Sequence, residues 1–129
     1  MSTQLENVIR VGIVDGINDK EGTIRVTFPD RDDMVADDIA LLDDSQNYPT
    51  IGDSVVCIFL PNGIQQGFCL GGYYHDQNPP PILDSNIYVK KIDEGLVIKY
   101  DFQSKKLTID AQNEITINGN LRVTGQIIN

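Results

Sequence analysis

Residue types on which most active sites depend are scarce in this chain of 129 residues. It contains no tryptophan, one histidine and two cysteines, and only four of its ten lysine and arginine residues lie in residues 1–81. No zinc-ligand spacing, phosphate-binding glycine loop or serine-nucleophile motif occurs. The composition therefore argues against an enzyme, and we expect no catalytic residue, no cofactor and no metal site.

Long apolar runs are also absent. No stretch approaches the roughly 18 apolar residues that a membrane-spanning helix needs. The N-terminus lacks the basic-then-apolar pattern of a signal peptide. We therefore expect a soluble protein that is made in the cytoplasm.

Charge is distributed unequally along the chain. Residues 1–81 carry thirteen acidic and four basic side chains, a net charge of −9, whereas residues 82–129 carry six of each. This difference suggests two modules with different surroundings. Because a strongly acidic first module repels phosphate backbones, we expect no nucleic-acid partner.

Two groups of residues could carry chemistry, and both have a simpler interpretation. Cys57 and Cys69 lie in apolar, strand-like runs, which predicts small core residues rather than a disulfide or a metal pair. A catalytic group could be imagined from Ser54, His75 and Asp76. His75, however, lies beside two tyrosines and a run of prolines, which is typical of a surface or linker residue.

The segment from Asp30 to Tyr48 contains seven aspartates and one short apolar run, Ile39–Leu42. Clustered carboxylates can bind calcium, but Asp30-Arg31-Asp32-Asp33 lacks the alternating ligands, central glycine and terminal glutamate of an EF-hand loop. We therefore predict a solvated acidic loop.

The sequence of the first module predicts short strands separated by turns. Apolar runs at 9–14, 23–28, 39–42, 54–60 and 67–74 are bounded by glycine, proline, asparagine and aspartate. Without a helix-period segment, these strands predict a small closed or nearly closed β-barrel over residues 8–78, preceded by a flexible N-terminus, residues 1–7. The run 54–60 is apolar on both alternating faces, which is typical of a strand buried on two sides. The proline-rich segment 79–86 predicts a linker.

Polarity alternates with a period of two from Leu107 to Ile127, which indicates an extended chain with one apolar and one polar side. Upstream, Leu96, Ile98, Tyr100 and Phe102 form a similar row on even positions, so residues 103–106 must contain a turn or bulge.

One copy of the chain has nothing to cover this apolar row. Three copies wound about a common axis would bury it and remove free strand edges. We therefore predict an all-β protein whose residues 87–129 form an intertwined, triple-stranded β-helix in a homotrimer. The simpler alternative is a half-buried meander in a monomer. The predicted trimer core consists of Leu107, Ile109, Ala111, Ile115, Ile117, Leu121, Val123 and Ile127.

Motifs along residues 8–128 are similar in kind and order to those of one protein family. They are Val11-Gly-Ile-Val-Asp15, Val26-Thr-Phe-Pro29, Tyr48-Pro-Thr-Ile-Gly-Asp-Ser-Val-Val56, Gly67-Phe-Cys-Leu-Gly-Gly-Tyr73 and the closing Gly119-Asn-Leu-Arg-Val-Thr-Gly125. Together they resemble the baseplate assembly protein V and VgrG spike family, which has an N-terminal OB-fold domain followed by a trimeric β-helix.

This resemblance implies a mechanical role. Members are the central spikes of contractile phage tails, tailocins and type VI secretion systems. Their OB-fold domains attach to a baseplate hub protein, and their β-helix is driven through the envelope of the target cell. The implied location is a virion or tailocin baseplate assembled in the cytoplasm of the bacterial host. By analogy, the acidic stretch Asp30–Asp44 would be an attachment or solvent surface.

The C-terminal end departs from the family. Many phage spikes finish in a His-x-His metal-binding tip, whereas this sequence ends in Gln126-Ile127-Ile128-Asn129 and has its only histidine at position 75. We therefore expect a tip of Ile127, Ile128 and Asn129 that a separate PAAR-type protein could cap. The alternative function is a trimeric fibre, adhesin or other binding module built on an OB-fold. A fibre or adhesin would be expected to widen into a head with exposed aromatic residues, which this sequence lacks.

Overall fold

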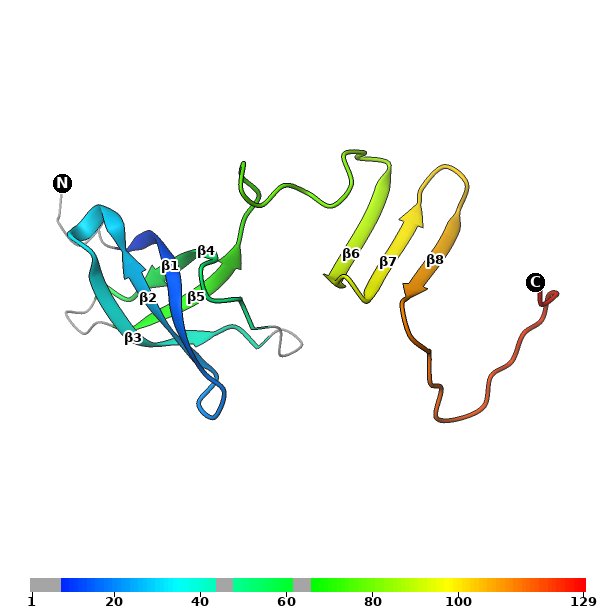
Figure 1. Cartoon of the computed structure of the whole chain (residues 1–129), viewed down its shortest axis with the longest axis horizontal. Coiled ribbons are helices and arrows are strands. Elements are labelled where there is room, and N and C mark those ends of the chain that lie inside the picture. Colours follow the sequence, from blue (N-terminus) through cyan, green and yellow to red (C-terminus); the bar gives the residue numbers. More distant parts are fainter. Residues whose placement is uncertain (1–7, 44–47, 62–65) are drawn as a thin grey trace. The chain divides into compact units, whose positions relative to one another are not determined.

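The computed structural model describes residues 8–43, 48–61 and 66–129, and the chain divides into two compact units between Asn78 and Pro79. The described residues form eight strands and no α-helix, so the fold is all-β (Figure 1). No helix in these ranges is long and apolar enough to cross a membrane. The segment 1–7, which we predicted to be flexible, lies outside the described residues.

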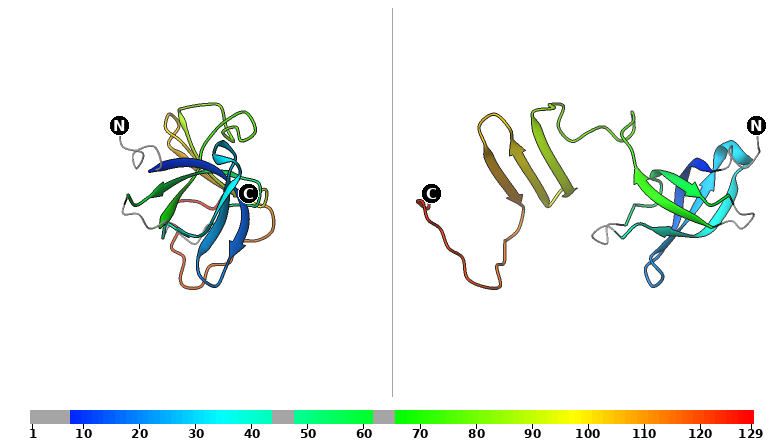
Figure 2. Two further views of the ribbon diagram at one scale, coloured as in Figure 1. Left: turned by 90° about the vertical axis from the view of Figure 1, so that its left-hand side faces the viewer. Right: turned by 180° about the vertical axis from the view of Figure 1, so that it is seen from behind.

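The first unit is a closed barrel of five strands. These are β1 (Ile9–Asn18), β2 (Thr23–Phe28), β3 (Met34–Leu41), β4 (Ser54–Phe59) and β5 (Gly67–Gly72). Around the barrel the strands follow the order β1-β2-β3-β5-β4, and β4 pairs with β1 to close it (Figure 2). Only β3 and β5 run parallel; the other pairs are antiparallel. This topology confirms the predicted barrel and is compatible with an OB-fold-like domain.

Alternate residues of β1, β2, β4 and β5, together with two residues of β3, fill the barrel. The buried core consists of Val14, Ile24, Val26, Phe28, Ala36, Ile39, Val55, Cys57, Phe59 and Cys69. Two glycines make room for its aromatic rings. A Cβ atom on Gly12 would lie 2.8 Å from the Phe28 ring, and one on Gly67 would lie 2.5 Å from the Phe59 ring. Both positions therefore require glycine for packing.

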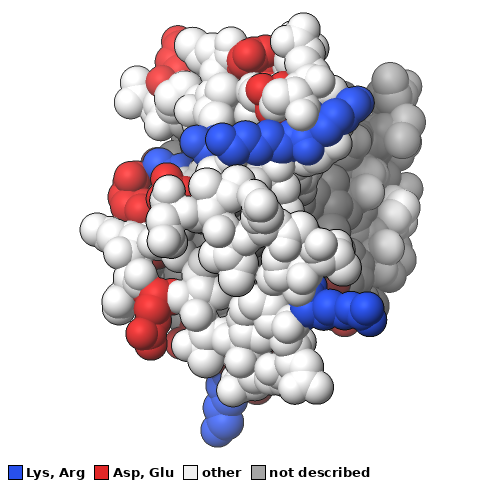
Figure 3. All heavy atoms as spheres, turned by 90° about the vertical axis from the view of Figure 1, so that its right-hand side faces the viewer, with Lys and Arg blue, Asp and Glu red and all other residues white. Residues whose placement is uncertain are grey.

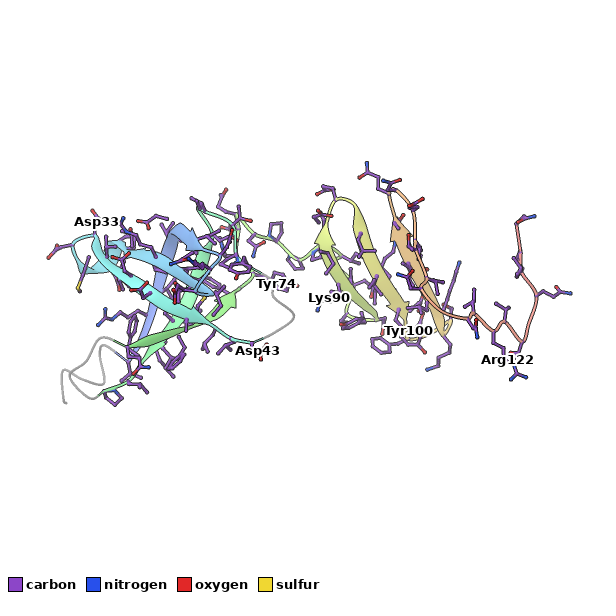
Figure 4. The ribbon with its side chains drawn as sticks, turned by 90° about the horizontal axis from the view of Figure 1, so that it is seen from below. Asp33, Asp43, Tyr74, Lys90, Tyr100 and Arg122 are labelled. Carbon is purple, nitrogen blue, oxygen red and sulfur yellow. The ribbon has the colours of Figure 1, made fainter. Side chains whose placement is uncertain are left out.

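The acidic segment differs from the prediction. Pro29–Arg31 form a short 3-10 turn (η1), and the chain then enters β3, where Ala36 and Ile39 are buried. Figure 4 labels Asp33 and Asp43, which precede and follow this strand. The prediction of a solvated loop is wrong for residues 34–38, which belong to β3, whereas the predicted apolar run 39–42 does enter this strand. Ala36 and Ile39 anchor the strand in the core, while Asp37 and Asp38 face solvent.

The second unit contains an antiparallel sheet of β6 (Ile87–Asp93), β7 (Leu96–Asp101) and β8 (Lys106–Ala111), in that order. A turn joins β7 to β8, in which the Lys105 amide donates a hydrogen bond to the Asp101 carbonyl at 2.8 Å. The Asp101 carboxylate accepts the amides of Gln103 and Ser104 at 2.9 and 3.2 Å, and these bonds lower the pKa of Asp101. The turn predicted near residues 103–106 is confirmed.

Candidate functional site

The register of β7 and β8 gathers apolar side chains on one side of the sheet. Three directly opposed pairs join the strands: Leu96 with Ala111, Ile98 with Ile109, and Tyr100 with Leu107. Because alternate residues of a strand point to the same side, these six residues form one surface, which we call the sheet's apolar face. Tyr88 of β6, opposite Tyr100, extends it. Figure 4 labels Tyr100 on the sheet.

On β7 and β8 the other side is largely polar, with the opposed pairs Val97 with Asp110, Lys99 with Thr108, and Asp101 with Lys106. On β6, Ile87 and Val89 lie on this side, and Lys90 lies on the apolar face opposite Ile98. Positive and negative charges balance in residues 82–129. In Figure 3, uncharged residues (white) make up most of the surface shown, with Lys and Arg (blue) and Asp and Glu (red) scattered over it. The sheet is therefore amphipathic.

The apolar face has no covering layer within its own unit. Residues 79–129 are described throughout, and they contain one sheet of three strands and no helix. Leu107 is 60% exposed and Ile109 is 50% exposed. Full burial of a large aliphatic side chain is worth about 1.5–3 kcal/mol, so a continuous exposed row of such side chains indicates a binding surface.

The predicted trimer core falls into two groups. Leu107, Ile109 and Ala111 lie on β8, opposite β7. The others lie in residues 112–129, which form no strand: Ile115, Ile117, Leu121, Val123 and Ile127, all of them exposed. The predicted tip residues Ile127, Ile128 and Asn129 are exposed as well. The structure thus brings the first group together with β7 and leaves the second without a partner strand in the same chain.

Ser54 and His75 line one hollow of about 290 Å³, together with Asp53 but without Asp76. The Gln77 amide donates a hydrogen bond to Nδ1 of His75 at 3.3 Å. Since Nδ1 accepts this bond, the neutral ring carries its proton on Nε2, which then cannot take a proton from a hydroxyl. Through Nε2, His75 therefore offers Ser54 no base. Within the described ranges, no group of three or more His, Cys, Asp or Glu residues could hold a metal ion.

Cys57 and Cys69 lie directly opposite each other on β4 and β5, and both are free and buried, which confirms their predicted place in the core. Their thiols form a hydrogen bond that raises the pKa of Cys57 and lowers that of Cys69, while burial raises both. The buried guanidinium of Arg10, which stacks 4.5 Å from the centre of the Phe59 ring, lowers the pKa of Cys57 by a smaller amount.

Replacing Cys57 with alanine is expected to raise the pKa of Cys69. The hydrogen bond that favours the Cys69 thiolate would be lost, while burial would still disfavour it. Ultraviolet absorbance of the thiolate, followed against pH in the native protein, measures the change. The first titration step should move to higher pH in Cys57→Ala. In Cys69→Ala the remaining step belongs to Cys57, whose pKa should fall because the hydrogen bond that raises it is lost. An unchanged midpoint in Cys57→Ala would show that the two thiols do not interact.

A second exposed apolar surface, on the barrel, was missed by the sequence analysis. Val56 and Ile58 point outward from β4 and are only half-buried, and Val11 on the neighbouring β1 is 44% exposed. The signal was present in residues 54–60, whose two apolar faces predict a strand buried on both sides. In the structure only the inner face of β4 is fully buried.

The described residues therefore contain two surfaces suited to binding, one on each unit, and both are apolar rather than catalytic in composition. No protein-family model matches this chain, and no curated protein matches it.

Proposed function

We propose that this chain is the central spike of a contractile injection machine of the kind found in phage tails, tailocins and type VI secretion systems. The observation that carries the proposal is the register of β7 and β8. It places three apolar pairs on one face of a sheet that has no second layer within its own unit. Such a face needs other chains to cover it, and the proposed occupants are two further copies of the same chain.

Three copies suit the C-terminal pattern better than one. In a triple-stranded β-helix, the apolar row of each copy faces the common axis and the polar row faces water. The exposed residues after Ala111 alternate in the same sense, from Ile115 to Ile127. Strands from neighbouring copies would supply the backbone hydrogen bonds that residues 113–129 do not make with the described part of their own chain.

A rod of this kind suits a mechanical task. Its backbone is hydrogen-bonded across chains and it has no free edge, so it resists bending and unfolding under an axial load. In the proposed machine, the barrel attaches to the baseplate hub and the rod enters the target envelope when the sheath contracts. The exposed side chains of Ile127 and Ile128 are the proposed contact for a PAAR-type tip protein. No step requires a cofactor or a catalytic residue.

The mass in solution tests the oligomeric part of this proposal. Light scattering on a sizing column should give the full-length protein a mass near three times 14.3 kDa. A chain ending at Pro81 should be monomeric, because it lacks the β6–β8 sheet and the residues that follow it. A monomeric full-length protein would rule out the trimeric rod, and a trimeric truncated chain would move the association to the barrel.

A further inference from the structure

The outer surface of the barrel has two sides of different chemistry. On the side of β2 and β3, Arg25 pairs with Asp15 at 3.4 Å and with Asp37 at 3.7 Å. The opposite side is formed by β4, β5 and the first part of β1 (residues 9–13), whose outward residues carry no charge; Asp15, farther along β1, belongs to the charged side. We call this surface the outer apolar face; it consists of Ile9, Val11, Ile13, Val56, Ile58, Phe68 and Leu70.

The outer apolar face is continuous from strand to strand. Ile9 lies opposite Ile58, which in turn lies opposite Phe68. Val11 lies opposite Val56. Ile9 and Leu70 are 64% and 51% exposed. A contiguous patch of this kind on an otherwise acidic domain is typical of a protein-binding surface.

A hollow of about 320 Å³ lies at one edge of this face. It is lined by Val11, Gly12, Ile13, Pro29, Asp30 and Ser54. Asp30 is the one charged residue in this lining, and its carboxylate forms no ion pair or hydrogen bond with the residues that the structure describes. The hollow therefore combines apolar walls with a carboxylate that no described residue pairs.

The negative charge of the barrel favours a basic partner over a second copy of the barrel. Residues 1–81 have a net charge of −9, so two such barrels packed face to face would bring like charges together. A lysine or arginine from another protein suits the hollow better. Its aliphatic stem would pack on Val11 and Ile13, and its cationic end would bind the Asp30 carboxylate.

We infer that the outer apolar face of β1, β4 and β5 is the docking surface for a protein that is apolar at its centre and carries a lysine or arginine for Asp30. The identity of this partner as the baseplate hub rests on the proposed function. The surface and its chemistry rest on the barrel alone.

Binding of the full-length protein to the purified hub protein of the same machine tests the inference. Val11→Glu places a charge on the outer apolar face and should weaken binding by about tenfold or more, as loss of a central contact does. Val35→Glu is the matched control, because Val35 is exposed to a similar degree, 37% against 44%, on β3. Asp30→Asn should weaken binding and reduce its dependence on salt.

The possible results distinguish the inferred docking surface from the proposed function as a spike. Weaker binding by Val11→Glu and Asp30→Asn, with Val35→Glu unaffected and all melting temperatures close to that of the wild type, supports the docking surface. If Val11→Glu does not fold, the binding affinity of Asp30→Asn and its salt dependence are sufficient to test the docking surface.

Equal binding by every variant overturns the docking surface and leaves the proposed spike function unaffected. Failure of the wild type to bind overturns the hub as partner and, with it, the attachment part of the proposed function. A change in oligomeric mass caused by Val11→Glu would assign the face to contacts between copies and overturn the inference.

Discussion

Replacing Ile109 with aspartate is expected to reduce the mass of the full-length protein in solution from about three times 14.3 kDa to 14.3 kDa. Ile109 lies at the centre of the sheet's apolar face, opposite Ile98. In the proposed trimer, the substitution would place three carboxylates near one axis, away from water. Burial of each unpaired charge costs several kcal/mol, and mutual repulsion adds to this cost. Light scattering or analytical ultracentrifugation measures the result.

Thr108→Asp is the matched control for this experiment. Thr108 is the adjacent residue, but it points to the polar side of the sheet, opposite Lys99. The same change there should leave the trimer intact. If Ile109→Asp remained trimeric, or if both variants dissociated equally, the apolar face could not be the surface that joins the copies.

Replacing Phe28 with alanine is expected to lower the free energy of unfolding of the barrel by about 3–5 kcal/mol. The Phe28 side chain is 0% exposed and meets the Phe59 ring edge-on, with 5.8 Å between ring centres. It also lies 5.4 Å from the guanidinium of the buried Arg10. Its removal leaves a cavity and takes an aromatic partner from a buried cation, and both effects destabilise the folded state.

Calorimetry of the full-length protein, compared with the wild type, gives the size of this effect. Ile17→Ala is a suitable control, because Ile17 belongs to the same hairpin and is 38% exposed; it should change stability much less. The mass of Phe28→Ala should stay that of the wild type, since the proposed association lies in the second unit. A loss below about 1 kcal/mol would be that of an ordinary surface position and would contradict the role of Phe28 as the centre of the core.

The sequence predicted the barrel well where strands follow a period of two. It missed the first part of β3, residues 34–38, and the reason is local. The register of β3 against β2 shifts between Ile24 and Val26, and Asp38 takes a φ of 58°, so the buried residues Ala36 and Ile39 are three positions apart. A bulge of this kind breaks the alternating pattern. The aspartates around the bulge therefore led to the prediction of a solvated loop.

The C-terminal unit shows a different limit. The alternation from Leu107 onward indicates an extended chain, and β8 forms where β7 supplies hydrogen bonds. Beyond Ala111 the same alternation continues without a strand in the single chain. A polarity pattern specifies which side chains share a face, but a strand also needs a neighbouring backbone. For the outer apolar face, the pattern of residues 54–60 was visible, but only the closed barrel shows which side faces outward.

The two units also differ in how far apart their paired strands lie along the chain, which bears on the order of folding. β6, β7 and β8 pair only with their sequence neighbours, whereas barrel closure brings Ile9 to Ile58, about fifty residues away. Local hairpins form in microseconds, while non-local closure carries a larger entropic cost and is slower. We therefore expect the C-terminal meander to form early in each new chain and the barrel to close later. In the proposed trimer, the encounter of three chains would be the step whose rate depends on protein concentration.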